Sequence, residues 1–258
     1  MDAETLRRAL GYPYPAPAQD CVWTKSRIVR LKGGGVNAVA DALLEVGANP
    51  RARRTPVLAI GSNRAPEQLA RKFRDFPDDT AVVLARATLK DFDIVYGAGI
   101  AGYGAVGGAT LAPSPGTAVE AWVTWLDDNQ LTKMHETEGL AARVYGYFEL
   151  QQIELTFASG PVWNSVLAYV QRAGALNLGG APVALAEIPA SGRRFQALRQ
   201  PQLQERMRDQ FAAGRPVQAF IVENIDPDGP RQARMSLLRR SAIPFDWRHF
   251  QDRTPRNL

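Results

Sequence analysis

One carboxylate in the sequence combines a helical position with an apolar face. Asp127 can cap a helix that the glycine after Glu138 can end, and Leu131, Met134 and Glu138 then share one face. That face aims the Glu138 carboxylate at the interior, where desolvation and the negative end of the helix raise the pKa of a carboxyl group. Such a group can accept and return a proton near neutral pH. The sequence equally allows a partly exposed Glu138 that is bridged to Arg143 or another base.

The scarcity of cysteine and histidine narrows the available chemistry. The single cysteine, Cys21, excludes an intrachain disulfide and any site that needs two thiolates, and two histidines exclude a three-histidine metal site. A Ser-His-Asp triad would have to use His135 or His249 as its base. We expect His135 at the surface or at a helix end, and His249 in packing contact with the aromatic residues around Trp247. Acid–base chemistry therefore rests on a carboxylate, and we expect no metal.

A short polar loop, Gly61-Ser62-Asn63, is predicted between a buried strand and a helix. Residues 56–60 form the apolar strand, and Pro66 suits the first turn of the helix. Backbone N–H groups in such a loop, with a positive helix terminus behind them, favour a carboxylate or a developing oxyanion. The alternative is an ordinary turn in which Ser62 or Asn63 caps the helix.

A second glycine-rich segment, residues 97–102, matches the G-x-G-x-x-G pattern of dinucleotide-binding proteins, and Glu120 follows about 20 residues later. That motif works by placing a pyrophosphate at a helix N-terminus. Residues 103–116 contain further glycines and two prolines, which prevent a helix there. We therefore predict a loop between strands and no nucleotide site.

The elements that must position these residues are mostly short strands. The predicted strands after the first one cover residues 81–85, 92–96, 118–126, 144–150, 153–157, 165–170 and 217–222. Helices are predicted between residues 35 and 47 and at about 201–213. Because strands and helices do not alternate, the pattern favours an α+β barrel over a doubly wound sheet. Residues 227–258 are expected to be poorly structured or peripheral.

The basic character of the chain is confined to its C-terminal part. The net charge of +5 over 258 residues arises in residues 190–258, which hold 13 arginines and 7 acidic residues. This distribution makes a nucleic-acid-binding surface unlikely, although an Arg-rich patch for an anionic partner stays open. The pairs Arg193-Arg194 and Arg239-Arg240 are expected on solvated faces. We find no apolar segment of 18 residues and no signal peptide, and we expect a cytoplasmic protein.

Several ordered motifs over residues 57–150 resemble those of the γ-glutamylcyclotransferase-like family. Residues 57–63 (VLAIGSN) are similar to its opening strand and Tyr-Gly-Ser-Asn loop, and residues 85–93 (ARATLKDFD) to its Arg-Leu-x-x-Phe strand. Residues 108–116 (GATLAPSPG) are similar to its Ala-Thr-Ile and Ser-Pro-Gly segment. Residues 134–139 (MHETEG) resemble Leu-Asp-x-x-Glu-Gly, and Tyr145 follows the acid where the family also places a tyrosine.

The resemblance implies a small mixed β-barrel with flanking helices and a cavity that binds a small molecule. Family members convert a γ-glutamyl amide into 5-oxoproline and a free amine without a cofactor. Glu138 is then the general acid and base, and the substrate-binding residues are Ile60, Gly61, Ser62, Asn63 and Tyr145. Glu138 would accept a proton from the α-ammonium group, so that the amine attacks its own γ-carbonyl, and would then protonate the departing nitrogen. Two positions depart from the family pattern, with Ile60 in place of the loop tyrosine and His135 in place of the aspartate.

We expect three regions along the chain: an N-terminal extension over residues 1–55, the γ-glutamylcyclotransferase-like domain over 56–225, and an Arg-rich tail over 226–258. The favoured hypothesis is an enzyme. The alternative is a non-catalytic small-molecule-binding or protein-interaction domain on the same fold, with the basic tail contacting a partner. Fold alone does not decide between these, because one fold supports many functions.

Overall fold

The protein is an α+β structure built on a closed, mixed β-barrel, as the sequence predicts. The computed structural model describes residues 3–33 and 35–256. Five strands form the barrel in the order β5-β3-β7-β6-β4, and β4 pairs with β5 to close it. Only β3 and β7 are parallel among these pairs. The bounds are β3 (Thr55–Ala59), β4 (Ala81–Tyr96), β5 (Ala109–Leu126), β6 (Tyr145–Phe157) and β7 (Val162–Gln171).

The barrel strands β4 and β6 are each a single long strand, where the sequence predicts two shorter ones. In β4 the register shifts between Lys90 and Phe92, and in β6 between Gln151 and Leu155. Asp91 has a φ of 62°, which marks the bulge that breaks the apolar pattern of β4. The prediction of separate strands was therefore wrong, because a bulge resembles a turn in sequence while the strand continues through it.

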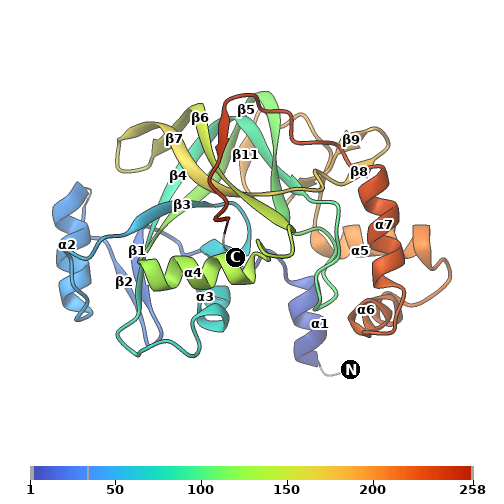
Figure 1. The fold of residues 1–258 in the computed structure, drawn as a ribbon, viewed down its shortest axis with the longest axis horizontal. Helices are drawn as coiled ribbons and strands as arrows, with labels where there is room; N and C mark the ends of the chain where they lie inside the picture. Colours follow the sequence, from blue (N-terminus) through green and yellow to red (C-terminus); the bar gives the residue numbers. More distant parts are fainter. Residues whose placement is uncertain (1–2, 34, 257–258) are drawn as a thin grey trace.

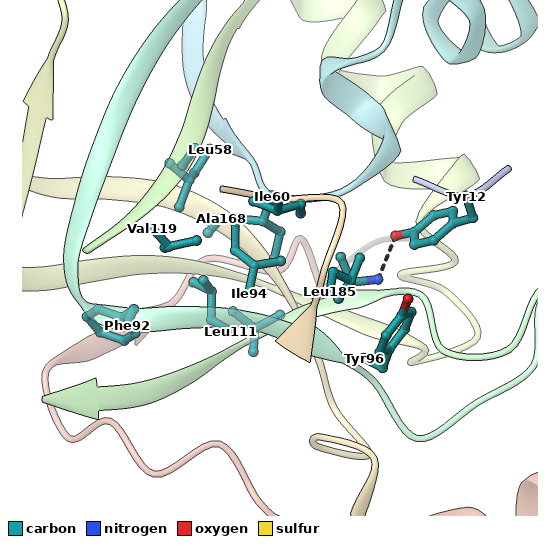
Figure 2. Packing of buried hydrophobic residues seen from close by; sticks show 14 of the residues in the cluster. Tyr12, Leu58, Ile60, Phe92, Ile94, Tyr96, Leu111, Val119, Ala168 and Leu185 are labelled. Carbon is teal, nitrogen blue, oxygen red and sulfur yellow. Dashed lines mark hydrogen bonds between the residues drawn. The ribbon is translucent and has the colours of Figure 1, made fainter. Parts of the chain in front are cut away.

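Alternate residues of the barrel strands fill its interior. Figure 2 shows this packing, in which Leu58, Ile94, Leu111 and Val119 meet inside the barrel, and all four side chains are buried. Full burial of an aliphatic side chain of this size contributes about 1.5–3 kcal/mol. This rigid interior fixes the strand ends from which the cavity residues extend.

A second apolar cluster fastens two helices to the outside of the barrel. Trp122 of β5 is buried together with Leu69 and Phe73 from the α3 region and with Met134 of α4. The helices α3 (Pro66–Lys72) and α4 (Asp128–Thr137) therefore lie side by side against the barrel, as Figure 1 shows. The predicted helix that ends near Glu138 is confirmed by α4.

The remaining helices gather at two ends of the molecule (Figure 1). Helix α2 (Gly35–Glu45) confirms the prediction at residues 35–47 and lies at one end. Helices α1 (Ala3–Leu10), α5 (Gln200–Phe211), α6 (Val217–Ile225) and α7 (Arg231–Arg240) gather at the other end. The strand predicted at residues 217–222 was wrong, since α6 buries Phe220, Ile221 and Asn224 at helical spacing.

The C-terminal part is ordered and packs on the outside of the barrel, so it is peripheral, as one of the two expectations had it, and not poorly structured. The strand β13 (Phe250–Asp252) pairs with β6, and the Trp247 ring packs at 4.8 Å from the Phe92 ring. His249 lies 5.6 Å from the Trp247 ring, which confirms its packing role. Arg193 donates to the buried Asp93 carboxylate at 2.9 Å, so its prediction as a solvated residue was wrong. An ordered tail of this kind covers part of the barrel.

Short strands complete the sheets around the barrel. They are β1 (Cys21–Thr24), β2 (Ile28–Arg30), β8 (Asn177–Leu178), β9 (Ala181–Pro182), β10 (Ala184–Leu185), β11 (Ala190–Ser191) and β12 (Ala197–Leu198). The segment 97–108 between β4 and β5 is a loop with no helix, as predicted. None of the helices in residues 3–33 and 35–256 is both long and apolar enough to cross a membrane.

Candidate functional site

Local sequence signals place Glu138 at the end of α4. The side chain of Asp127 accepts a hydrogen bond from the backbone N–H of Gln130, and the Gln130 side chain accepts one from the Asp127 N–H, at 2.8 and 3.0 Å. This capping box fixes the start of the helix. Gly139, with a φ of 64°, ends it just after Glu138. Met134 is buried on the same face, so the carboxylate is carried inward.

The Glu138 carboxylate is held by two side chains from another part of the chain. Its Oε1 accepts hydrogen bonds from Asn63 Nδ2 at 3.0 Å and from Lys72 Nζ at 2.5 Å. The Glu138 and Lys72 side chains are only 13% and 5% exposed. Among the described residues, none donates a hydrogen bond to Oε2. We call Glu138, Lys72 and Asn63 the carboxylate cluster; it holds one carboxylate oxygen and leaves the other free to exchange a proton.

Lys72 is the member of this cluster that the sequence analysis missed. Glu138 pairs with Lys72, at the end of α3, so the alternative of a bridge to a base other than Arg143 is confirmed, and Arg143 is exposed. A signal was present, because Lys72 lies three residues after the buried Leu69 and so shares its helix face. A lysine at such a position is usually expected to extend its head group to solvent, which is why spacing alone did not single it out.

The Gly61-Ser62-Asn63 loop turns directly into a 3₁₀ helix, Ser62–Arg64, before α3 begins. The N-cap of α3 is Ala65, without a side-chain hydrogen bond, so neither Ser62 nor Asn63 caps that helix. The positive terminus of α3 therefore lies beyond the loop rather than behind Gly61. What the loop supplies to the site is the Asn63 side chain and the backbone around Gly61, which lines the cavity.

Two tyrosines hold the backbone of Ala109, one on its N–H and one on its carbonyl oxygen, next to the loop. The Tyr145 hydroxyl donates to the carbonyl oxygen of Ala109 at 3.2 Å, and the Tyr12 hydroxyl accepts the Ala109 N–H at 2.6 Å. A Cβ added at Gly61 would lie 2.5 Å from the Tyr12 oxygen, so only glycine fits there. We call Tyr12 and Tyr145 the tyrosine pair. Burial, together with the nearby Glu138 charge, raises the pKa of Tyr145, which keeps its hydroxyl neutral.

A single cavity of about 1590 Å³ contains the carboxylate cluster and the tyrosine pair. All six site residues predicted from the sequence line it, namely Ile60, Gly61, Ser62, Asn63, Glu138 and Tyr145. The rim adds residues that the sequence analysis assigned elsewhere: the loop 99–103, Arg8 of α1, and Arg231 and Arg239 of α7. Both ends of the chain thus contribute to the same cavity.

His135 lies in the last turn of α4, as expected, but its side chain is buried behind the cavity wall rather than at the surface. Its Nδ1 hydrogen bonds to the hydroxyl of Tyr169 at 2.8 Å, and its ring packs at 4.7 Å from the Tyr147 ring. Burial lowers the pKa of His135, which favours the neutral imidazole. Tyr169 lines the cavity, so His135 supports the wall without lining the cavity itself.

The side chains at this site suit acid–base chemistry on an organic substrate. Within the described part of the chain, no three His, Cys, Asp or Glu residues gather closely enough to hold a metal ion. The carboxylate cluster and the tyrosine pair together place one carboxylate, one ammonium group, one amide and two neutral hydroxyls in the cavity. Such a set can bind polar groups and pass protons.

Comparisons with known proteins place the chain near a few solved structures. No family model matches the sequence, and no curated protein matches it either. It is similar to a structure titled "Gamma-glutamyl cyclotransferase", with 17% identity, 76% of this chain and 92% of that chain covered, and a TM-score of 0.37. It is also similar to an uncharacterized protein from Homo sapiens, with 16% identity, 76% of this chain and 91% of that chain covered, and a TM-score of 0.39. For YkqA from Bacillus subtilis the identity is 14%, the coverage is 78% of this chain and 66% of that chain, and the TM-score is 0.34.

Proposed function

We propose that the protein is a cytoplasmic, cofactor-free γ-glutamylcyclotransferase-like enzyme that converts a γ-glutamyl amide into 5-oxoproline and a free amine. The observation that carries this proposal is the Glu138 carboxylate in the cavity, with Oε1 held by Asn63 and Lys72 and Oε2 free. The motifs that resemble the family supply the reaction class, and the geometry supplies a proton acceptor beside a space for the substrate.

The reaction needs only proton transfers and an intramolecular attack. Glu138 accepts a proton from the substrate α-ammonium group, and the freed amine attacks the γ-carbonyl carbon. A C–N bond forms, the carbonyl electron pair moves to oxygen, and backbone donors at Gly61 and Ser62 stabilise that charge. The protonated Glu138 gives its proton to the departing nitrogen as the amide C–N bond breaks. Glu138 then takes the second proton from the ring nitrogen and passes it to the released amine.

The orientation of the bound substrate supplies most of the rate acceleration that proton transfer does not. Because the nucleophile and the carbonyl belong to one molecule, holding the chain in a folded conformation replaces an encounter between two molecules. Asn63 can take part, since its Oδ1 is buried and has no hydrogen-bond partner in the described part of the chain. That oxygen is an acceptor available to the substrate ammonium group.

The rival function is a non-catalytic domain that binds a small molecule on the same fold. The observation that favours it is the buried ion pair, because Lys72 already occupies one oxygen of the carboxylate. In a binding protein, Glu138 and Lys72 would recognise a polar ligand, and no product would form. The basic α7 then serves as a wall of the cavity or as a contact for a partner.

The test is a panel of γ-glutamyl amides with 5-oxoproline followed by mass spectrometry. We expect wild-type turnover and a loss of about 10²- to 10⁴-fold in Glu138→Gln, which keeps the shape but not the proton acceptor. Glu136→Gln is the matched control, because Glu136 is exposed on the same helix and pairs with Lys133. Equal activity in Glu138→Gln, or no turnover by any of the three proteins, would contradict the proposal.

A further inference from the structure

Tyr12 reaches the cavity from a segment outside the barrel. The residue follows α1 and lies 97 positions before Ala109, whose backbone N–H it accepts at 2.6 Å. Figure 2 shows the Tyr12 ring at the edge of the buried cluster, near Ile60 and Tyr96, with this hydrogen bond dashed. Tyr12 lines the cavity together with Gly61, whose missing side chain lets the hydroxyl approach.

The proton of this hydroxyl has no acceptor among the residues that the structure describes. In residues 3–33 and 35–256, no group accepts a hydrogen bond from the Tyr12 hydroxyl, which acts only as an acceptor for Ala109 N–H. Burial raises the pKa of Tyr12 well above its ordinary value, so the group stays protonated. A hydroxyl whose oxygen already accepts a hydrogen bond is polarised and becomes a better donor. The result is a neutral donor in the cavity wall with a free proton.

The N-terminal segment is fixed firmly enough for this donor to be placed with precision. Arg7 forms an ion pair with Glu67 of α3 at 3.0 Å, and the Arg71 guanidinium lies 4.8 Å from the centre of the Tyr14 ring. These contacts tie the segment to α3, the same helix that carries Lys72.

We propose that Tyr12 is a catalytic residue that donates a hydrogen bond to the γ-carbonyl oxygen of the substrate as that oxygen gains charge. This inference rests on the proposed function. When the α-amine attacks, the carbonyl electron pair moves to oxygen and the Tyr12 proton hydrogen bonds to it without being transferred. When the amide C–N bond breaks, the pair returns and the donor is unchanged. The side chain of Ile60, which precedes Gly61, cannot donate a hydrogen bond. The hydroxyl next to Gly61 is that of Tyr12, which lies outside the barrel.

A purely structural role for Tyr12 makes a different prediction. Phenylalanine at this position removes the acceptor for the Ala109 N–H, so an anchoring residue would lower the melting temperature. At temperatures well below that transition, kcat and KM would then stay at wild-type values. Loss of a group that donates a hydrogen bond to the transition state lowers kcat even when the protein is fully folded.

The experiment compares Tyr12→Phe with Tyr14→Phe, measuring kcat, KM and melting temperature on the best γ-glutamyl amide. Both changes remove a hydroxyl from the same segment, and Tyr14 does not line the cavity. We expect kcat to fall by about 10²-fold in Tyr12→Phe, in the range seen for loss of one oxyanion donor, with KM nearly unchanged. Tyr14→Phe should keep wild-type kcat. A Tyr12→Phe protein with kcat within about twofold of wild type would overturn the inference.

A second variant covers the case in which Tyr12→Phe does not fold. Incorporating 3-fluorotyrosine at position 12 keeps the shape of the side chain, the hydrogen bond from the Ala109 N–H and the proposed hydrogen bond to the substrate. The fluorine makes the hydroxyl a stronger donor. We expect kcat to rise, whereas an unchanged kcat would overturn the inference. Failure of the proposed function is distinguishable, because the wild-type protein would then form no 5-oxoproline from any amide in the panel. That result overturns both proposals. If the wild type is active and kcat does not respond to the changes at position 12, only the inference about Tyr12 is overturned.

Discussion

The two polar groups of the cavity differ in charge and in how they are built. The carboxylate cluster is charged, and its members lie on α3, α4 and the loop between β3 and α3. The tyrosine pair is neutral, and its members, from the N-terminal segment and from β6, hold the backbone N–H and carbonyl oxygen of Ala109. A charged group can move protons, whereas neutral donors stabilise charge that appears elsewhere. We therefore expect substitutions in the two groups to differ in their effects on kcat and on the free energy of unfolding.

The largest expected effect is on catalysis by the carboxylate cluster. Glu138→Asp keeps the charge but withdraws the carboxylate by one methylene, which moves it away from both Lys72 and the substrate. We expect kcat to fall by about 10²-fold, since an error of about 1 Å in placement is enough for such a loss. Steady-state kinetics on a γ-glutamyl amide measure it, and a kcat near wild type would show that the position of the carboxylate is unimportant.

Next in size is the loss of stability when the ion pair is broken. Lys72→Met leaves Glu138 without its buried partner, so we expect the free energy of unfolding to fall by about 2 kcal/mol, below the 3–5 kcal/mol of a fully enclosed pair. Lys133→Met is the control, because its pair with Glu136 is exposed and contributes about 0.5 kcal/mol at most. Urea unfolding of both variants measures the difference. Equal losses would mean that the Lys72 pair does not hold the cluster together.

A smaller effect is expected from the tyrosine pair. Tyr145→Phe removes the donor to the Ala109 carbonyl oxygen, a single neutral hydrogen bond worth about 1 kcal/mol. Urea unfolding should show this loss, with a smaller decrease in kcat than in Glu138→Asp. If Tyr145→Phe lost more activity than Glu138→Asp, the assignment of proton transfer to the carboxylate cluster would be wrong.

The smallest expected effect is a pH dependence that comes from His135. Burial lowers its pKa in the folded state, so below the ordinary value of about 6.5 the unfolded chain binds more protons than the folded one. Stability should therefore fall as the pH drops below that value. His135→Gln should reduce this fall, as measured by urea midpoints at pH 7.5 and 5.5. An identical pH dependence in the variant would contradict the assignment.

Sequence signals were sufficient where the structure is local. The helix that carries Glu138 begins at the Asp127 cap and ends at Gly139, as predicted, and the Gln130 side chain completes the capping box. The loop at Gly61 was also located correctly. That the Gly61 loop and Glu138 line one cavity followed only from the family resemblance, and the hydrogen bond between Asn63 and Glu138, 75 positions apart, was not predicted.

Sequence signals failed where distant segments decide the outcome. The apolar run at Val217–Ile225 suits a strand or a helix equally, and its packing with α1, α5 and α7 selects the helix. Tyr12 carries no local sign of its role, and the position of Lys72 on the buried face of its helix is only a weak one. Each side chain becomes part of the cavity only when another element packs against it. Pairings of this kind are set by the closed barrel and the segments that pack on it.

The most direct test of the proposed activity follows the fate of the substrate nitrogen. A γ-glutamyl amide labelled with ¹⁵N at the α-amino group is incubated with the protein, and the products are identified by mass spectrometry. Intramolecular attack predicts 5-oxoproline with ¹⁵N in its ring, an unlabelled free amine, and almost no product with Glu138→Gln. Labelled glutamate in place of 5-oxoproline, or product that forms equally well without the Glu138 carboxylate, would contradict the assignment.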